Sequence, residues 1–158
     1  MCYEDSLFPQ RIRPDKGVLI KDHQPTLVFV TICTKGYKPW LATDTNHCLL
    51  RTIWTEATYW KVGTYIVMPN HLHFFAWPGR LHADVDDWVQ YWKSIFTKRL
   101  RKPDCRWQRA SFHHRIRSDE SAEERRAYMI ENPVRAGLVQ RACDWPYGGE
   151  VFKPGFWW

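Results

Sequence analysis

Short β-branched and aromatic runs alternate with longer stretches of helical periodicity, and the order of these patterns limits the folds open to this chain. The runs that predict strands are residues 26–34 (TLVFVTICT), 64–68 (TYIVM), 71–77 (HLHFFAW) and 112–117 (FHHRIR). The stretches that predict helices, from apolar residues three and four apart, are 44–61, 84–101 and 121–131. The predicted order is therefore β-α-β-β-α-β-α. This order is typical of an α+β domain in which helices pack on an antiparallel sheet.

The predicted boundaries come from turn and capping residues. Gly63 is expected to end the first helix, and Pro103 follows the second. Ser121 and Glu124 have the spacing of a capping box at the start of the third helix. Residues 1–22 are expected to form an irregular arm, and the tail after the third helix is expected to be irregular aromatic packing.

The length of 158 residues predicts a single domain, residues 1–158. No apolar stretch approaches the roughly 20 residues of a membrane span, and the N-terminus lacks the order of a signal peptide. We therefore expect a cytoplasmic protein. The five cysteines are odd in number and widely spaced, so we expect buried free thiols and no disulfide framework or zinc ribbon.

Positive charge is concentrated in one part of the sequence. Between Lys93 and Arg117 there are nine Lys or Arg residues and one acidic residue, Asp104, within a formal net charge of +6 for the chain. Such a block favours a polyanionic partner, although a solvated basic face is the common alternative. The residues of this block that are candidates for binding a nucleic acid, DNA in particular if the motifs below are considered, are Lys98, Arg99, Arg101, Lys102, Arg109, Arg115 and Arg117.

Aromatic residues are interleaved with this basic block, and the chain contains ten tryptophans. Exposed rings can stack on unpaired bases, which contributes about 1–3 kcal/mol per base. Many of these rings must nevertheless lie in the core, because a small domain has to bury apolar surface. The combination of charge and rings favours single-stranded nucleic acid as the partner.

His71 and His73 are the first candidate site residues. Side chains two apart on a strand point to the same face, so the two imidazoles would form a surface that can bind a metal ion. A pair of half-buried strand histidines is the common alternative. Tyr128 and Asn132 are the second candidates, because residues four apart share one helix face. A tyrosine in the core and an asparagine at a helix end are the common alternatives for that pair.

Taken together, the motifs resemble a known family. Residues 67–73 (VMPNHLH) resemble the V-M-P-[ND]-H-x-H stretch of single-tyrosine transposases of the HUH superfamily. Residues 128–139 (YMIENPVRAGLV) resemble the Y-I-x-x-N-P-V-[RK]-x-G-L-V stretch of the REP-associated tyrosine transposases. Residues 29–36, 107–109 with 112–114, and Trp145-Pro146 also match that branch. The resemblance covers roughly residues 26–150. One departure is His113, where the family often has an acidic residue, so no role is assigned to His113 or His114.

The resemblance implies a ferredoxin-like antiparallel sheet with helices packed on it, the HUH nuclease fold. It implies that His71 and His73 bind a divalent metal ion, that Asn132 completes the metal shell, and that Tyr128 is the nucleophile. It further implies cleavage of single-stranded DNA at hairpin-forming repeats through a 5′-phosphotyrosine intermediate. Mg²⁺ or Mn²⁺ is the expected cofactor, and no nucleotide is expected because the chain lacks a phosphate-binding G-x-x-x-x-G-K-[ST] loop. A monomer associated with the bacterial nucleoid is expected, with a homodimer as the alternative.

Three other functions fit part of the pattern. A hairpin DNA- or RNA-binding protein without catalysis, or a domesticated enzyme, would carry the same charge and rings. A small zinc hydrolase could use His71 and His73, but it lacks a third ligand at convincing spacing and would leave the basic block unexplained. The third alternative is a structural or interaction protein in which the motifs are incidental.

Overall fold

A computed structural model describes residues 26–80, 83–116 and 122–154. The strands are β1 (Val28–Cys33), β2 (Trp60–Val67), β3 (His71–Pro78), β4 (Phe112–Arg115) and β5 (Gly148–Glu150). The helices are α1 (Asp44–Glu56), α2 (Val85–Leu100), α3 (Ala122–Ile130) and α4 (Asn132–Arg135), with short 3₁₀ turns at Lys35–Tyr37 and Ala142–Asp144. No helix in these ranges is long and apolar enough to cross a membrane.

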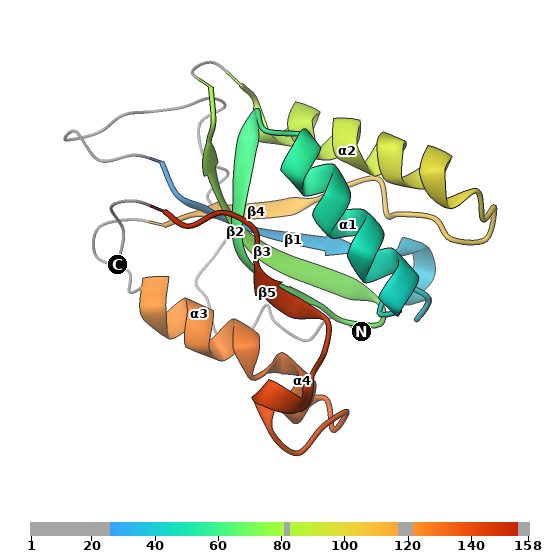
Figure 1. The fold of residues 1–158 in the computed structure, drawn as a ribbon, viewed down its shortest axis with the longest axis vertical. Coiled ribbons are helices and arrows are strands. Elements are labelled where there is room, and N and C mark those ends of the chain that lie inside the picture. Colours follow the sequence, from blue (N-terminus) through green and yellow to red (C-terminus); the bar gives the residue numbers. More distant parts are fainter. Residues whose placement is uncertain (1–25, 81–82, 117–121, 155–158) are drawn as a thin grey trace.

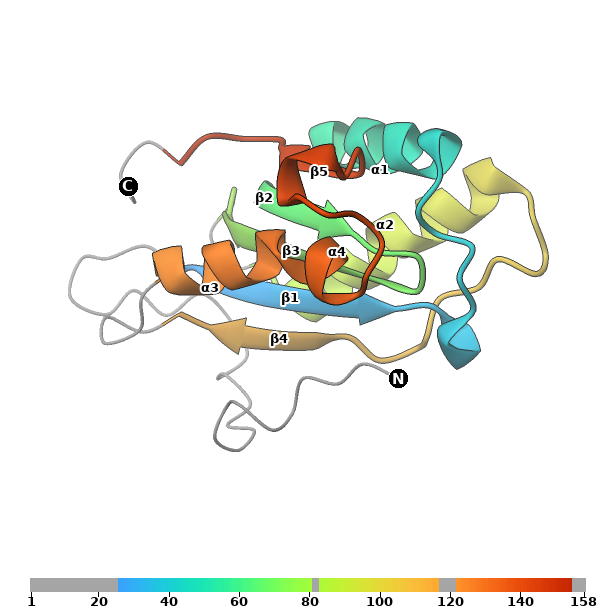
Figure 2. The same ribbon diagram turned by 90° about the horizontal axis from the view of Figure 1, so that it is seen from below.

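The five strands form one antiparallel sheet in the order β4-β1-β3-β2-β5. Helices α1 and α2 lie over one face of this sheet, and α3 and α4 lie on the other (Figure 1). Figure 2 shows α3 and α4 in front of the sheet. The α+β class with helices on an antiparallel sheet, predicted from the sequence, is therefore confirmed.

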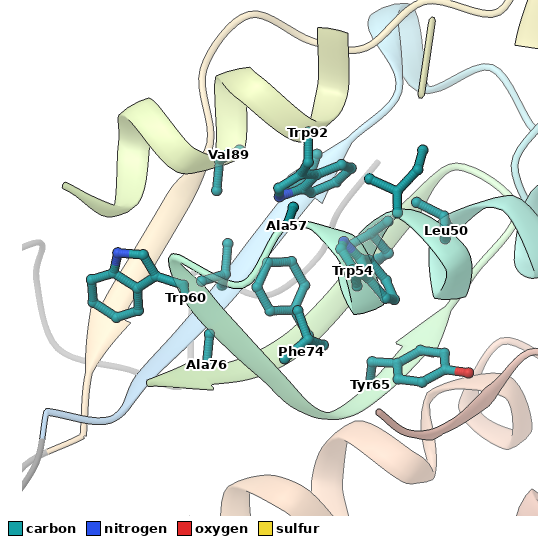
Figure 3. Close-up of a cluster of buried hydrophobic side chains, with 14 of the residues drawn as sticks. Leu50, Trp54, Ala57, Trp60, Tyr65, Phe74, Ala76, Val89 and Trp92 are labelled. Atoms are coloured by element: carbon teal, nitrogen blue, oxygen red, sulfur yellow. The ribbon is translucent and has the colours of Figure 1, made fainter. Parts of the chain in front are cut away.

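Alternation along the strands produces two cores. On β3, Leu72, Phe74 and Ala76 pack toward α1 and α2. Trp54 of α1 and Trp92 of α2 meet Phe74 in this larger core, with ring centroids 5.5 and 6.3 Å from the phenyl ring (Figure 3). Phe75 and Trp77 point the other way and pack with Met129 of α3 in a smaller core. Two-residue periodicity therefore assigns each β3 side chain to one layer.

Two predicted boundaries are wrong at the first helix. Helix α1 ends at Glu56 rather than near 61, and Gly63 lies buried inside β2 instead of ending the helix. A Cβ at Gly63 would lie 2.7 Å from Cζ3 of Trp77, so the glycine allows the indole ring to approach the backbone. Glycine is common at helix ends, but in β2 it is needed for close packing of a side chain against the backbone.

The C-terminal tail is more ordered than predicted. Strand β5 pairs with β2 through Gly148 and Ile66, and Trp145 Nε1 donates to the carbonyl of Val67 at 3.0 Å. The expectation of buried cysteines is correct for Cys33 but wrong for Cys48 and Cys143, which are exposed; all four cysteines in the described ranges are free thiols. The arm predicted over 1–22, Arg117 and Ser121 lie outside the described residues.

Candidate nuclease site

Strand β3 places His71 and His73 on the face that α3 covers. Between them, Leu72 is fully buried in the opposite core. The two imidazole rings are neighbours, with centroids 4.8 Å apart. The predicted shared face for the two histidines is therefore present.

Neighbouring side chains hold both rings. Oδ1 of Asn70 lies 2.7 Å from Nδ1 of His71, and because that oxygen can only accept, Nδ1 donates and Nε2 carries the lone pair. On the adjacent strand, Thr31 Oγ1 lies 2.8 Å from Nδ1 of His73, and the Phe29 ring stacks on His73 at 5.2 Å. These contacts orient the two imidazoles before any ligand arrives.

Burial keeps both histidines neutral. It lowers the pKa of His71 to about 4. Burial also lowers the pKa of His73 well below its usual value, and the nearby charges of Arg135 and Arg125 lower it further. Neutral imidazole is the form that binds a metal ion. Arg125 of α3 lies 5.3 Å from the centroid of the Phe29 ring, which itself stacks on His73, so α3 lies close to the imidazoles.

The sequence predicted that Tyr128 and Asn132 share one helix face. In the structure they do not lie on one continuous helix. Helix α3 ends at Ile130, and Asn132 begins the four-residue helix α4 after Glu131. Pro133 explains the interruption because it has no N–H to donate to the preceding turn. Tyr128 is half-buried, whereas the Asn132 side chain is enclosed.

Arg135 joins these two residues. Its guanidinium carbon lies 3.5 Å from the centroid of the Tyr128 ring. Nη2 donates to the backbone carbonyl of Tyr128 at 2.8 Å and also to Oδ1 of Asn132. Arg135 lies at the [RK] position of the motif at 128–139, but no role was assigned to it from the sequence; its position three residues after Asn132 was a further signal.

The donor set fits a divalent ion with mixed ligands. Within the described ranges, no three His, Cys, Asp or Glu residues are grouped to hold a metal. The resemblance implies Asn132 as a third ligand, through its amide oxygen. That oxygen accepts from Arg135 and retains a second lone pair, so one contact does not exclude the other. Two imidazoles and one amide leave open positions, as a catalytic site requires.

The basic residues are only partly brought together. Lys98 and Arg99 end α2, Arg101 and Lys102 follow it, and all four side chains are exposed. They lie at the C-terminal end of α2, and α2 covers the face of the sheet opposite to α3 (Figure 1). The loop after them returns to the His71 end of the sheet, since Gln108 N donates to the carbonyl of Cys33, which pairs with His71.

Two candidate DNA-binding residues have different positions. Arg109 is exposed in this loop, while Arg115 lies half-buried on β4 opposite Val28, at the far end of β1 from His71. Arg99 donates to Glu56 at 2.7 Å, so its charge is already paired. The basic residues are therefore divided between the end of α2, the loop that follows it and β4.

Lys93, which contributed to the basic block, is not a surface residue. It is 4% exposed, and its Nζ donates to the carbonyl of Gln108 at 2.7 Å. Burial lowers the pKa of Lys93 to about 8. Its place in the apolar stripe, four residues after Val89 and three before Phe96, was the signal that it faces inward.

Most of the aromatic residues near the basic block are core residues. Trp88, Trp92 and Phe96 are buried, and Trp107 packs against the same core. Tyr91 and Phe112 are exposed, at 54% and 44%. Base stacking by this block is therefore confined to few rings. His113 contacts Asp86 of α2 at 3.3 Å, which directs its side chain away from the face of His71 and His73.

Comparison with known proteins gives two curated relatives and a structural neighbour. The chain is 31% identical over 98 residues to a Haemophilus influenzae protein that carries the name REP-associated tyrosine transposase provisionally, covering 51% of this chain and 53% of that protein. It is 29% identical over 90 residues to the REP-associated tyrosine transposase of Escherichia coli, covering 55% and 52%. The chain thus spans about half the length of the curated relatives it matches. No family model matches it.

A solved structure described as the REP-associated tyrosine transposase bound to a REP hairpin has the same fold. Its TM-score is 0.68 at 20% sequence identity, over 84% of this chain and 90% of that chain. The fold predicted from the motifs is therefore confirmed independently of the sequence match. The chain is similar, in sequence and in fold, to the REP-associated tyrosine transposases.

Proposed function

We propose that this chain is a metal-dependent transesterase that recognises hairpin-forming repeats in single-stranded DNA and cleaves beside them. The observation that supports this most is the arrangement around β3. His71 and His73 lie neutral on the face that α3 covers, and Tyr128 and Asn132 come from α3 and α4. The similarity to proteins named as transposases supports the same reaction class.

In the proposed reaction, Tyr128 is the nucleophile. A bond forms between its Oη and the scissile phosphorus, and the bond from phosphorus to the 3′ oxygen breaks. The phenol loses its proton to solvent, and the 3′ oxygen takes one up. The products are a 5′-phosphotyrosine and a free 3′-hydroxyl, so the phosphodiester energy is kept and a DNA 3′-hydroxyl can reverse the step.

His71, His73 and Asn132 are the residues that would hold Mg²⁺ or Mn²⁺. A bound divalent ion would supply positive charge to the non-bridging phosphate oxygens. The chain itself provides neutral imidazoles, an oriented amide and a tyrosine on helix α3. Such preorganisation matters because in-line attack depends on the position of the nucleophile.

The exposed residues Lys98, Arg101, Lys102 and Arg109 are proposed to bind DNA phosphates. They lie apart from Tyr128, at the loop that returns to the His71 end of the sheet. A hairpin held there would extend its single-stranded foot around the sheet edge toward the other face. Recognition of the duplex and cleavage of the single strand would then use different layers of one domain.

The decisive experiment is covalent trapping. Hairpin oligonucleotides from the DNA that flanks the gene, labelled at the 3′ end, are incubated with the protein and Mn²⁺ and run on a denaturing protein gel. We expect a labelled adduct with the wild type and with Tyr91→Phe, which alters an exposed tyrosine, and none with Tyr128→Phe. Tight, salt-sensitive binding without any adduct would instead identify a non-catalytic hairpin-binding protein.

A further inference from the structure

Arg135 makes three contacts with two residues of the proposed site. Its guanidinium covers the Tyr128 ring at 3.5 Å, and Nη2 reaches the Tyr128 carbonyl at 2.8 Å and Oδ1 of Asn132. A planar guanidinium can stack on a ring and donate in its own plane at the same time, which an ammonium cannot do. The contact set therefore uses properties specific to arginine.

These contacts bridge the interruption between α3 and α4. Glu131 separates the two helices, and Pro133 supplies no N–H to continue the hydrogen-bond ladder. The relative position of Tyr128 and Asn132 is therefore not fixed by one helix. Arg135, which lies in α4 and touches the ring and the carbonyl of a residue in α3, connects the two sides directly.

Arg135 also determines which way the Asn132 amide faces. The guanidinium offers only donors, so it must meet Oδ1 and not the amide nitrogen. Nδ2 of Asn132 is buried and has no hydrogen-bond partner among the residues that the structure describes. Reversing the amide would place two donors against each other, so the contact with Arg135 holds one orientation.

We propose that Arg135 is a positioning residue that fixes the Tyr128 ring and the Asn132 amide relative to each other. The inference rests on the proposed function for its catalytic consequence, while the positioning itself can be measured without cleavage. Arg135 is exposed to solvent. Under this proposal it positions the nucleophile, Tyr128, and does not bind the DNA. A misplaced nucleophile slows the reaction without weakening substrate binding.

The first test measures single-turnover adduct formation with Arg135→Ala and Arg135→Lys. We expect both variants to slow the reaction by about 10- to 100-fold while the hairpin Kd stays within about twofold of the wild type. Arg141→Ala is the matched control, because it removes an exposed arginine from the same segment that pairs with Asp144. Added guanidinium, at concentrations that do not denature, should accelerate Arg135→Ala but not the wild type, whereas methylammonium should not.

The second test does not depend on cleavage. With 3-fluorotyrosine at position 128 alone, the ¹⁹F signal should shift or broaden in Arg135→Ala and stay unchanged in Arg141→Ala. If the wild type forms no adduct but this signal moves, the proposed function fails and the positioning role stands.

Two results would overturn the positioning role. One is a wild-type adduct with the rate, the guanidinium response and the fluorine signal all unchanged in Arg135→Ala. The other is weaker hairpin binding with an unmoved fluorine signal, which would make Arg135 a phosphate contact. Either result would leave the nucleophilic role of Tyr128 to be decided by the trapping experiment.

Discussion

Thr31 Oγ1 lies 2.8 Å from Nδ1 of His73, across the β1–β3 pair in which these two residues are directly opposite. The hydroxyl oxygen can accept a hydrogen bond from Nδ1–H, which leaves the lone pair on Nε2. Residues that orient a ligand in this way contribute to metal affinity although they do not touch the metal. Thr31 would contribute to the proposed metal site for this reason. It lies in the matching stretch 29–36, but no role was assigned to it from the sequence.

The first prediction concerns this hydroxyl. Thr31→Val keeps the shape of the side chain but removes the hydrogen bond, so we expect Mn²⁺ affinity to fall by about 10- to 100-fold. Isothermal titration of the protein without DNA measures it. Thr52→Val is the control, because Thr52 is exposed and its hydroxyl donates to the Cys48 carbonyl within α1. Equal affinities in all three proteins would remove Thr31 from the site.

The second prediction concerns the salt dependence of hairpin binding. Lys98 and Lys102 have no acidic partner in the described part of the chain, whereas Arg99 is paired with Glu56. Lys98→Ala and Lys102→Ala should each reduce the slope of log K against log salt by about 0.7–0.9, and Arg99→Ala should change it less. Filter binding at several salt concentrations measures the slopes. Identical slopes in the wild type and both lysine variants would place the DNA on another surface.

The third prediction concerns pH and the buried Lys93. Its folded-state pKa of about 8 lies below the ordinary 10.5, so between these values the unfolded chain binds a proton that the folded chain has released. The contribution of Lys93 to the free energy of unfolding should therefore rise as pH increases from about 8 to 10.5 and stay constant below that window.

Urea denaturation across pH 7–10.5 tests this, with the wild type compared to Lys93→Met. As the pH rises, the free energy of unfolding of the wild type should increase relative to that of Lys93→Met. Lys98→Met, on the exposed side of the same helix, should follow the wild-type profile. Parallel profiles for the wild type and Lys93→Met would show that Lys93 is not buried as described.

The fourth prediction concerns the packing of Gly63. A methyl group there would lie 2.7 Å from Cζ3 of Trp77, so Gly63→Ala should lower the free energy of unfolding by about 1–3 kcal/mol. The loss should shrink in a Trp77→Leu background, where the ring is absent. Urea denaturation of the four proteins of this cycle measures the coupling. The same loss in both backgrounds would assign the cost to the backbone of β2.

Local patterns predicted most of the sheet and the residues of the candidate site. The run at 26–34 contains β1, the run at 71–77 lies within β3, and the stretch at 84–101 contains α2. Strand alternation also predicted that His71 and His73 share a face. These features depend on residues close in sequence, which is why period and capping residues suffice to find them.

Features that depend on distant residues were missed. Strand β5 has only three residues, including two glycines, and exists because β2 offers an edge to Gly148. Gly63 was read as a helix end because only the fold brings Trp77 against it. Lys93 was counted with the surface cations because its carbonyl partners, at Gln108 and Arg109, lie across a loop.

The sequence by itself determined the order of most elements and the two-histidine face, because these follow from spacing between residues close in sequence. It placed Tyr128 and Asn132 four residues apart, but the structure divides them between α3 and α4. Only the tertiary structure decided that Thr31 orients His73 and that Arg135 connects Tyr128 to Asn132 across the helix break. It also decided that the basic residues at the end of α2 lie on the face of the sheet opposite to α3. The physical reason is that hydrogen bonds and ring contacts between elements depend on how the layers pack. That packing is the sum of many side-chain contacts which no single motif records.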